Sequence, residues 1–245
     1  FIMKQIEEHF QLEIRGQRIP ARIIRERRRS VRASVGKEAV ILRLPILMPL
    51  ETQQKQIAWF KTWLEKKSLT HPDILVRFET KVYESGDVLQ VGERSYILQI
   101  GYSDKNSSSG KLKNKTIYLN MSENNGDANT IARLLSRLVA KDFLPEISAR
   151  VHELNVQFFR KKFNKIALKY NQSNWGSCSS KGNINLSTRL LFAPAIVRDY
   201  VIVHELAHLV EHNHSPRFWK LVAEAMPNYR EQEKWLKENG HLCRF

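Results

Sequence analysis

The sequence predicts an α+β fold, in which a basic, strand-rich N-terminal part precedes a second domain built around one helix that carries a metal-binding motif. Apolar and polar residues alternate, with turn signals between them, over residues 10–45 and 81–121. Apolar residues recur at helical spacing over three other stretches, residues 51–67, 129–162 and 196–210. We therefore expect a β-rich part with one helix at residues 1–125 and a second domain at residues 126–245.

The elements follow from these patterns in chain order. Residues 51–67 form a helix that buries Ile57, Phe60 and Leu64 on one stripe. The long helix at residues 129–162 has one apolar face and should be kinked or broken at Pro145. Short strands are then expected at residues 166–170, 173–177 and 183–186.

The chain carries a formal net charge of +15, and many of its arginines lie in the first predicted strands. Such an excess attracts polyanions through a salt-dependent, sequence-independent interaction. A nucleic acid or a nucleotide is therefore one candidate partner, and a solubilising surface without a dedicated partner is the other. The arginines concerned are Arg15, Arg18, Arg22, Arg25, Arg27, Arg28, Arg29 and Arg32.

We expect a cytoplasmic protein without a membrane-spanning segment. The longest uninterrupted apolar run, residues 190–197, is far shorter than the roughly 20 residues that a spanning helix requires. The first residues lack the charged-then-apolar pattern of a secretion signal. Cys178 and Cys243 are the only cysteines, which is too few for a disulfide scaffold and compatible with a reducing compartment.

The most informative motif is His204-Glu205-x-x-His208, within the predicted helix at residues 196–210. Side chains four residues apart share one helix face, about 6 Å apart along the axis, so both imidazoles can reach one ion. Glu205 points about 100° away from His204, which suits a carboxylate that acts on a metal-bound water. This pattern is typical of zinc hydrolases.

A third ligand requires the chain to turn back after this helix. If the helix simply continued, His214 would lie about 15 Å along the axis from His204, too far for a zinc–nitrogen bond of about 2.0 Å. Ser215 and Pro216 read as the N-cap and first position of a new helix that runs to Met226. We therefore choose His214 as the third ligand, with His212, placed on the first helix, as the alternative.

The C-terminal third resembles the bacterial YgjP-like family of metallopeptidases, which is similar to the SprT-like and Wss-type zincins. The segments that carry the resemblance are Trp175-Gly176-Ser177-Cys178, Asn183-Ile184-Asn185-Leu186, Asp199-Tyr200-Val201 through His208, and Asn213-His214-Ser215 with Phe218-Trp219. It implies a zincin-like metallopeptidase domain with Zn²⁺ on His204, His208 and His214 and Glu205 as the catalytic residue. Asn174 departs from the family, which usually has Arg there, so an ion pair made by that Arg is not implied here.

The substrate is expected to be a peptide or protein. In zincins a strand beside the cleft commonly accepts an extended substrate as an added strand, and Asn183, Ile184 and Asn185 are the candidates here. The alternative is an ordinary hairpin strand without this role. Cys178 lies just before this stretch, but no nearby histidine in the sequence could activate it as a nucleophile.

Two other functions remain open. Some relatives are described as nucleoside triphosphate pyrophosphatases, and the arginines could then hold phosphates. A non-catalytic, nucleic-acid-associated zinc protein is the third reading, although a structural zinc site needs no glutamate between its histidines. Glu205 therefore discriminates among these functions, and hydrolysis with Glu205 as general base is the function we expect.

Overall fold

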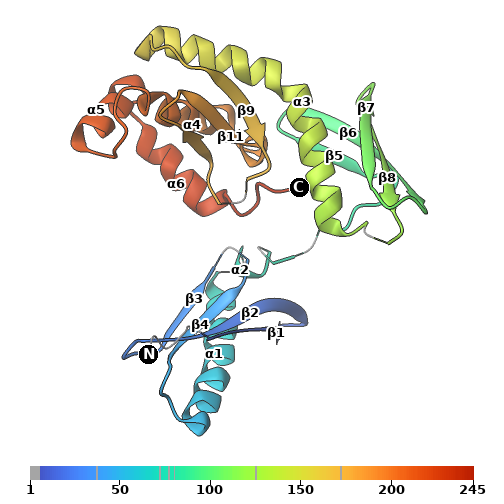
Figure 1. Cartoon of the computed structure of the whole chain (residues 1–245), viewed down its shortest axis with the longest axis vertical. Helices are drawn as coiled ribbons and strands as arrows, with labels where there is room; N and C mark the ends of the chain where they lie inside the picture. The colour runs from blue at the N-terminus through green and yellow to red at the C-terminus, as the bar shows by residue number, and fades with distance from the viewer. Residues whose placement is uncertain are drawn as a thin grey trace. The chain divides into compact units, whose positions relative to one another are not determined.

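The computed structural model describes residues 6–36, 38–71, 73–76, 78–79, 81–124, 126–171 and 173–245. The chain divides into two compact units, Phe1–Thr80 and Lys81–Phe245. Figure 1 shows the elements of both units. None of the described helices is both long enough and apolar enough to cross a bilayer.

The first unit is a four-stranded sheet with a helix packed against it. The strand order is β1-β2-β4-β3, in which β2 and β4 are parallel and the outer pairs are antiparallel. Helix α1 buries Phe60 and Leu64 against strand residues such as Leu42, which confirms the predicted helical stripe. The elements are β1 (Ile6–Ile14), β2 (Gln17–Glu26), β3 (Arg32–Val35), β4 (Val40–Pro45), α1 (Leu50–Thr70) and α2 (Asp73–Val76).

The second unit begins with another four-stranded sheet, in the order β5-β6-β8-β7. Helix α3 contacts β7 and β8 of this sheet and also contacts β9, which belongs to the next sheet along the chain. The elements are β5 (Val88–Val91), β6 (Arg94–Ser103), β7 (Ser109–Lys113), β8 (Thr116–Ser122), α3 (Ala128–Leu154) and the π-helical turn η1 (Asn155–Phe159). Helix α3 is therefore the shared wall between two sheets.

A three-stranded sheet and three helices complete the second unit. The strand order is β10-β11-β9, with β11 antiparallel to β10 and parallel to β9. Helix α4 contacts β10 and β11 as well as α3, α5 and α6. The elements are β9 (Lys165–Lys169), β10 (Gly176–Cys178), β11 (Asn183–Ser187), the 3-10 turn η2 (Thr188–Phe192), α4 (Ala195–Ala207), α5 (Pro216–Ala225) and α6 (Tyr229–Asn239).

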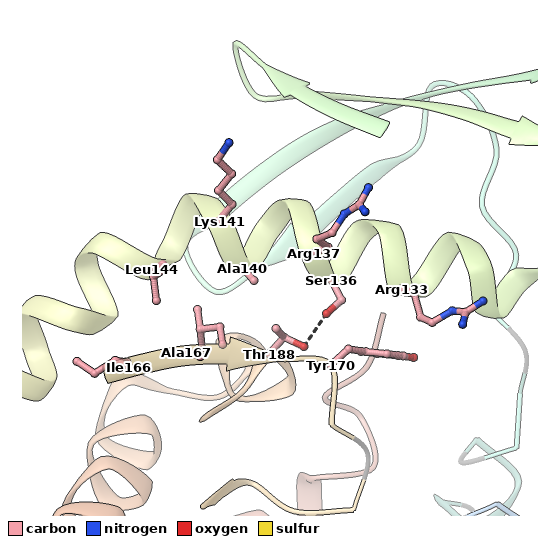
Figure 2. A pocket seen from close by; sticks show the side chains of 11 residues that line it. Arg133, Ser136, Arg137, Ala140, Lys141, Leu144, Ile166, Ala167, Tyr170 and Thr188 are labelled. Atoms are coloured by element: carbon pink, nitrogen blue, oxygen red, sulfur yellow. Dashed lines mark hydrogen bonds between the residues drawn. The ribbon is translucent and has the colours of Figure 1, made fainter. Parts of the chain in front are cut away.

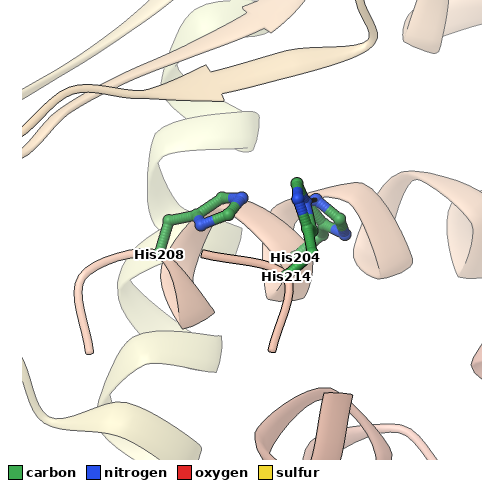
Figure 3. A group of neighbouring side chains, drawn as sticks. All are labelled: His204, His208 and His214. Atoms are coloured by element: carbon green, nitrogen blue, oxygen red, sulfur yellow. Dashed lines mark hydrogen bonds between the residues drawn. The ribbon is translucent and has the colours of Figure 1, made fainter. Parts of the chain in front are cut away.

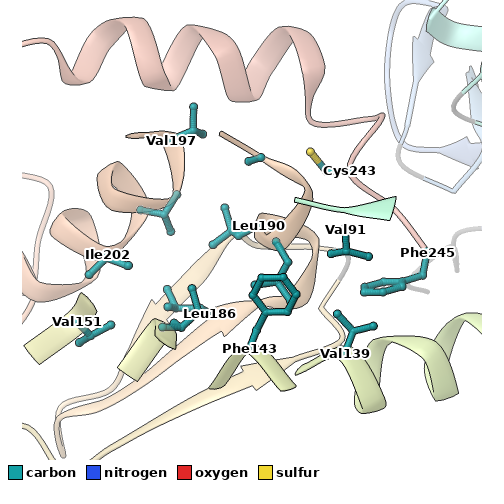
Figure 4. Close-up of a cluster of buried hydrophobic side chains, with 14 of the residues drawn as sticks. Val91, Val139, Phe143, Val151, Leu186, Leu190, Val197, Ile202, Cys243 and Phe245 are labelled. Atoms are coloured by element: carbon teal, nitrogen blue, oxygen red, sulfur yellow. The ribbon is translucent and has the colours of Figure 1, made fainter. Parts of the chain in front are cut away.

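One hydrophobic core runs through the whole second unit. It joins residues of the β5–β8 sheet, such as Val91, to Val139 and Phe143 of α3 and to Leu186 and Ile202 of the last third of the chain. Figure 4 shows these side chains gathered into one cluster. The boundary between the two compact units consequently falls between residues 80 and 81 of the chain, whereas the sequence pattern predicts a division between residues 125 and 126. The physical reason is that α3 buries side chains against both sheets and so binds them into one body.

Helix α3 continues through Pro145, so of the two expected outcomes there, a kink or a break, the break is wrong. Pro145 is exposed, and packing on either side of it holds the helix together, with Phe143 and Ile147 both buried. The predicted helix at residues 51–67 and the strands within residues 10–45 and 81–121 are confirmed. The result is the α+β architecture expected from the sequence, with a β-rich N-terminal part.

Candidate metal centre

Helix α4 presents His204 on its last turn and ends at Ala207, with His208 as its C-cap residue. The rest of the helix is core, because Val201, Val203 and Leu206 are buried. The imidazoles of His204 and His208 lie side by side, with ring centroids 5.1 Å apart, as the spacing of four residues predicts. The helix is shorter than the predicted stretch of residues 196–210.

The chain reverses after His208 and brings His214 back to the same place. The Nε2 atoms of His214 and His204 are 3.0 Å apart, and the rings of His214 and His208 are 4.8 Å apart between centroids. Helix α5 starts at the predicted residue, with the Ser215 hydroxyl accepting a hydrogen bond from the amide of Phe218. Figure 3 shows the three imidazoles converging from the end of α4 and the following loop.

These three histidines form a group that could hold a metal ion, since one nitrogen from each lies within 4.8 Å of the others. Ligand nitrogens at about 2.0 Å from a tetrahedral ion lie about 3.3 Å from one another, so the site requires only small closing movements. Three imidazole donors suit zinc, which prefers nitrogen and sulfur ligands. His212 is exposed, lies beyond the end of α4, and does not belong to the group, so the expectation that it continues the first helix is wrong.

Packing and one hydrogen bond orient the ligand rings. The Nδ1–H of His208 donates to the carbonyl oxygen of Glu211 at 3.1 Å, which leaves Nε2 of this ring with its lone pair. The indole of Trp219 stacks on His214 at 5.8 Å with an interplanar angle of 30°. Phe218, which is fully buried, lies 4.5 Å from the His208 ring. The exposed His214 is therefore held by α5 as well as by the loop.

Burial sets the protonation state that metal binding requires. It lowers the pKa of His204 to about 4, with smaller contributions from the positive charges of His208 and His214. Burial also lowers the pKa of His208. A neutral imidazole is the form that coordinates a metal. The two helix histidines are thus prepared to act as ligands at neutral pH.

Glu205 is buried, with 4% of its surface exposed, and its Oε2 atom has no hydrogen-bond partner among the described residues. Burial raises the pKa of its carboxyl group to about 8. A buried carboxylate without a partner is unfavourable for stability, and such groups concentrate at functional sites. Glu205 is therefore the residue of α4 that packing explains least.

Gly176 of β10 makes the space that Glu205 occupies. A methyl group on Gly176 would lie 2.5 Å from Oε1 and 2.8 Å from Cδ of Glu205, so any other residue would displace the carboxyl group. Cys178 follows two residues later on the same strand, and burial and the charge of Glu205 raise the pKa of its thiol to about 11. Cys178 is thus an uncharged thiol at neutral pH rather than a nucleophile.

The prediction that Asn183, Ile184 and Asn185 accept the substrate as an added strand is wrong. Strand β11 is the middle strand of its sheet and pairs with β10 on one side and with β9 on the other. Ile184 is also fully buried. Among the described strands, β10 forms the edge of this sheet nearest Glu205, because it carries Gly176.

Two supporting contacts were not identified from the sequence. Arg150 of α3 makes a bidentate ion pair with Asp199 of α4, at 3.0 and 2.7 Å, and so fixes the motif-bearing helix to the shared wall. Trp219 continues into a stack with Tyr229, 5.4 Å away, and Tyr229 in turn stacks on Tyr200. The sequence shows the neighbouring pairs Asp199-Tyr200 and Phe218-Trp219, but it does not show which distant residues these side chains contact.

We predict that Gly176→Ala lowers the free energy of unfolding by about 1–3 kcal/mol, because the new methyl group overlaps Glu205. The matched control is Gly101→Ala in strand β6, where the new methyl group would meet nothing within 4 Å and the change should stay within about 0.5 kcal/mol. Urea-induced unfolding measures both variants. Equal effects at the two positions would contradict the proposed contact.

We also predict a pH-dependent effect of Glu205→Gln on the metal-free protein. The pKa of Glu205 rises from 4.5 to about 8 on folding, so between these values the folded protein binds more protons than the unfolded one and its stability falls as the pH rises. Glutamine cannot lose a proton. The stability of the variant relative to the wild type should therefore increase from about pH 4.5 to about pH 8 and then level off.

Thermal or urea unfolding at several pH values, in the presence of a chelator, measures this difference. The control is Glu123→Gln, which makes the same change at an exposed position. A similar trend with pH in both variants would argue against burial as the cause.

The chain is similar to proteins that are described as metallopeptidases. The family model described as YgjP-like, metallopeptidase domain, matches residues 29–239. Comparison with curated proteins gives no match. The chain is similar to the crystal structure of the metallopeptidase zymogen abylysin of Pyrococcus abyssi, at 23% identity and a TM-score of 0.35 over 40% of this chain and 96% of that one.

The metallopeptidase zymogen jannalysin of Methanocaldococcus jannaschii is similar at 22% identity and a TM-score of 0.34, over 39% of this chain and 96% of that one. Both structural likenesses are too distant to assign a role to any residue. The family model spans most of the chain and includes all three histidines. The chain therefore belongs to the YgjP-like family and contains its metallopeptidase domain.

Proposed function

We propose that the protein is a zinc-dependent metallopeptidase that hydrolyses peptide bonds at the site formed by His204, His208, His214 and Glu205. The observation that carries the proposal is a buried carboxyl group that has no hydrogen-bond partner among the described residues and follows directly in sequence on one of three converging imidazoles. A purely structural metal site has no use for such a carboxyl group. The metallopeptidase domain shown by the family supports the reaction class.

In this proposal each group has one role. The three imidazoles hold the ion, and His208 is kept in the correct tautomer by the carbonyl oxygen of Glu211. When bound, zinc supplies a Lewis acid that lowers the pKa of water and polarises the scissile carbonyl group. Glu205 takes a proton from the attacking water and later delivers it to the leaving amine. A divalent cation nearby opposes the effect of burial on Glu205, because it stabilises the carboxylate form.

The free edge of β10 is the surface on which we place an extended substrate. It replaces the prediction for Asn183, Ile184 and Asn185, because the neighbouring edges of β11 are already paired. Ser177 lies on β10 between Gly176 and Cys178 and is exposed. An extended peptide that adds to this edge lies beside the strand that contacts Glu205, which is where its scissile bond must be.

The alternative partners, nucleic acid and nucleotides, gain no comparable support from the structure. Several of the clustered arginines are paired with acidic side chains of the same sheet: Arg22 with Glu7 at 3.0 Å, and Arg25 with Glu8 at 2.8 Å. Arg28 pairs with Glu26 at 3.0 Å. These arginines belong to the first unit, whereas the three histidines and Glu205 belong to the second. We therefore propose peptide hydrolysis and propose neither alternative.

We predict one zinc ion per chain and its loss in His214→Ala. His212→Ala is the matched control, since it removes a histidine two residues away that lies outside the group. Each variant is equilibrated with a small excess of zinc, unbound zinc is removed, and elemental analysis then measures the number of zinc ions per chain. Loss of zinc from the His212 variant together with retention in the His214 variant would show that the ligand assignment is wrong.

We predict that Glu205→Gln retains zinc, because the amide has nearly the same shape as the carboxyl group. Its rate of hydrolysis should fall by about 100-fold or more, because the amide cannot accept the proton. The assay follows the release of labelled fragments from an unfolded, fluorescein-labelled protein. Glu224→Gln, an exposed position on α5, is the control and should keep its turnover. Turnover at the wild-type rate in the Glu205 variant would rule out the base role.

A further inference from the structure

A groove lies between helix α3 and strand β9. It has a volume of about 340 Å³ and is lined by residues of α3, of β9 and of the turn that follows β11. Figure 2 shows the two elements running alongside each other, with Arg133, Arg137 and Lys141 on the helix and Ile166 and Ala167 on the strand. Neither the three histidines nor Glu205 lines this groove.

The groove follows the free edge of strand β9. In the order β10-β11-β9 this strand is terminal, and no described strand pairs with its outer side. Ile166, Ala167 and Leu168 all line the groove although they are consecutive. Side chains of consecutive strand residues point to opposite faces, so a cavity that touches all three lies along the backbone edge rather than over one face. Unpaired N–H and C=O groups of such an edge can accept another extended chain.

The wall and floor of the groove leave few polar groups for a small ligand. Ala140, Leu144 and Tyr170 contribute largely apolar surface. Ser136 and Thr188 are both buried, and their hydroxyl groups bond to each other at 2.8 Å. The backbone edge and the charges on the rim are therefore the features available for recognition.

The rim of the groove is a row of three cations on one face of α3. Arg133, Arg137 and Lys141 are exposed, and the described residues give none of them a carboxylate partner within 4.0 Å. They recur every four residues, which places them about 6 Å apart along the helix axis. Alternate side chains of an extended strand recur about every 6.7 Å, nearly the same interval. A chain lying in the groove with acidic residues at every second position would meet all three cations.

We propose that this groove is a docking site for an extended, acidic segment of another polypeptide, which adds as a strand to the outer edge of β9. Its alternate carboxylates face Arg133, Arg137 and Lys141, and its remaining side chains meet the apolar wall. The free strand edge and the apolar lining favour a polypeptide over a polynucleotide, which would require more cations along its phosphates. The groove lies at the opposite edge of the sheet from Gly176, so docking leaves the metal centre open.

The test uses the full chain and a fluorescein-labelled peptide of ten residues that alternates glutamate and valine. Fluorescence polarisation at low salt should show saturable binding in the presence and absence of a chelator, and none for the peptide with lysine in place of glutamate. The double variant Arg137→Glu with Lys141→Glu should weaken binding about tenfold or more. Lys113→Glu, an exposed lysine of β7 outside the groove, is the matched control and should leave binding unchanged.

A second comparison separates strand addition from simple charge attraction. Two further peptides carry N-methyl groups at the odd or at the even residues, which removes hydrogen-bond donors along one edge only. Strand addition requires that one of the two lose binding and the other retain it. Equal binding of both peptides, an equal effect of the Lys113 variant, or no binding of the unmodified peptide would overturn the proposal. Tighter binding of a ten-nucleotide single strand, sensitive to the same double variant, would overturn it in favour of a nucleic acid.

Discussion

Helix α4 has to end before His214, and the architecture of the metal centre depends on that ending. A helix continued to His214 would carry its imidazole about 15 Å along the axis from His204. Instead the helix stops at Ala207, and Ser215 caps a new helix that faces back toward the first. The reversal brings two nitrogens of residues ten positions apart to 3.0 Å from each other. Because the second helix also contributes Phe218 and Trp219, the element that closes the loop also orients the ligand rings.

The shared wall formed by α3 supplies the rigidity behind this reversal. It packs on both sheets of the second unit, and its Arg150 fixes Asp199, which lies five residues before the first histidine. The same helix presents opposite chemistry to its two neighbours, with a buried apolar face toward the core and a row of cations above β9. One helix therefore supports the metal centre and forms one side of the proposed docking groove.

Local patterns predicted the parts of this structure that depend on neighbouring residues. The motif helix, the Ser215 cap and the return of His214 all follow from spacing and from the reach of a helix. Local patterns could not predict that β11 lies between two partner strands, because β9 and β11 pair residues that are 18 positions apart in the sequence, such as Lys165 and Asn183, with strand β10 between them. Gly176 belongs to a motif that the sequence analysis names, but its contact with Glu205 could not be predicted because that contact depends on tertiary packing.

The Glu205 carboxyl group, which has no hydrogen-bond partner among the described residues, would also link the supply of metal to the lifetime of the protein. Burying this carboxyl group makes the metal-free fold less stable than its core alone would allow. Any ion that binds the folded site and not the unfolded chain restores that stability by mass action. The free concentration of the ion then sets the fraction of unfolded chains, which are the ones that cellular proteases degrade. Metal scarcity would in this way reduce the number of molecules as well as the activity of each one.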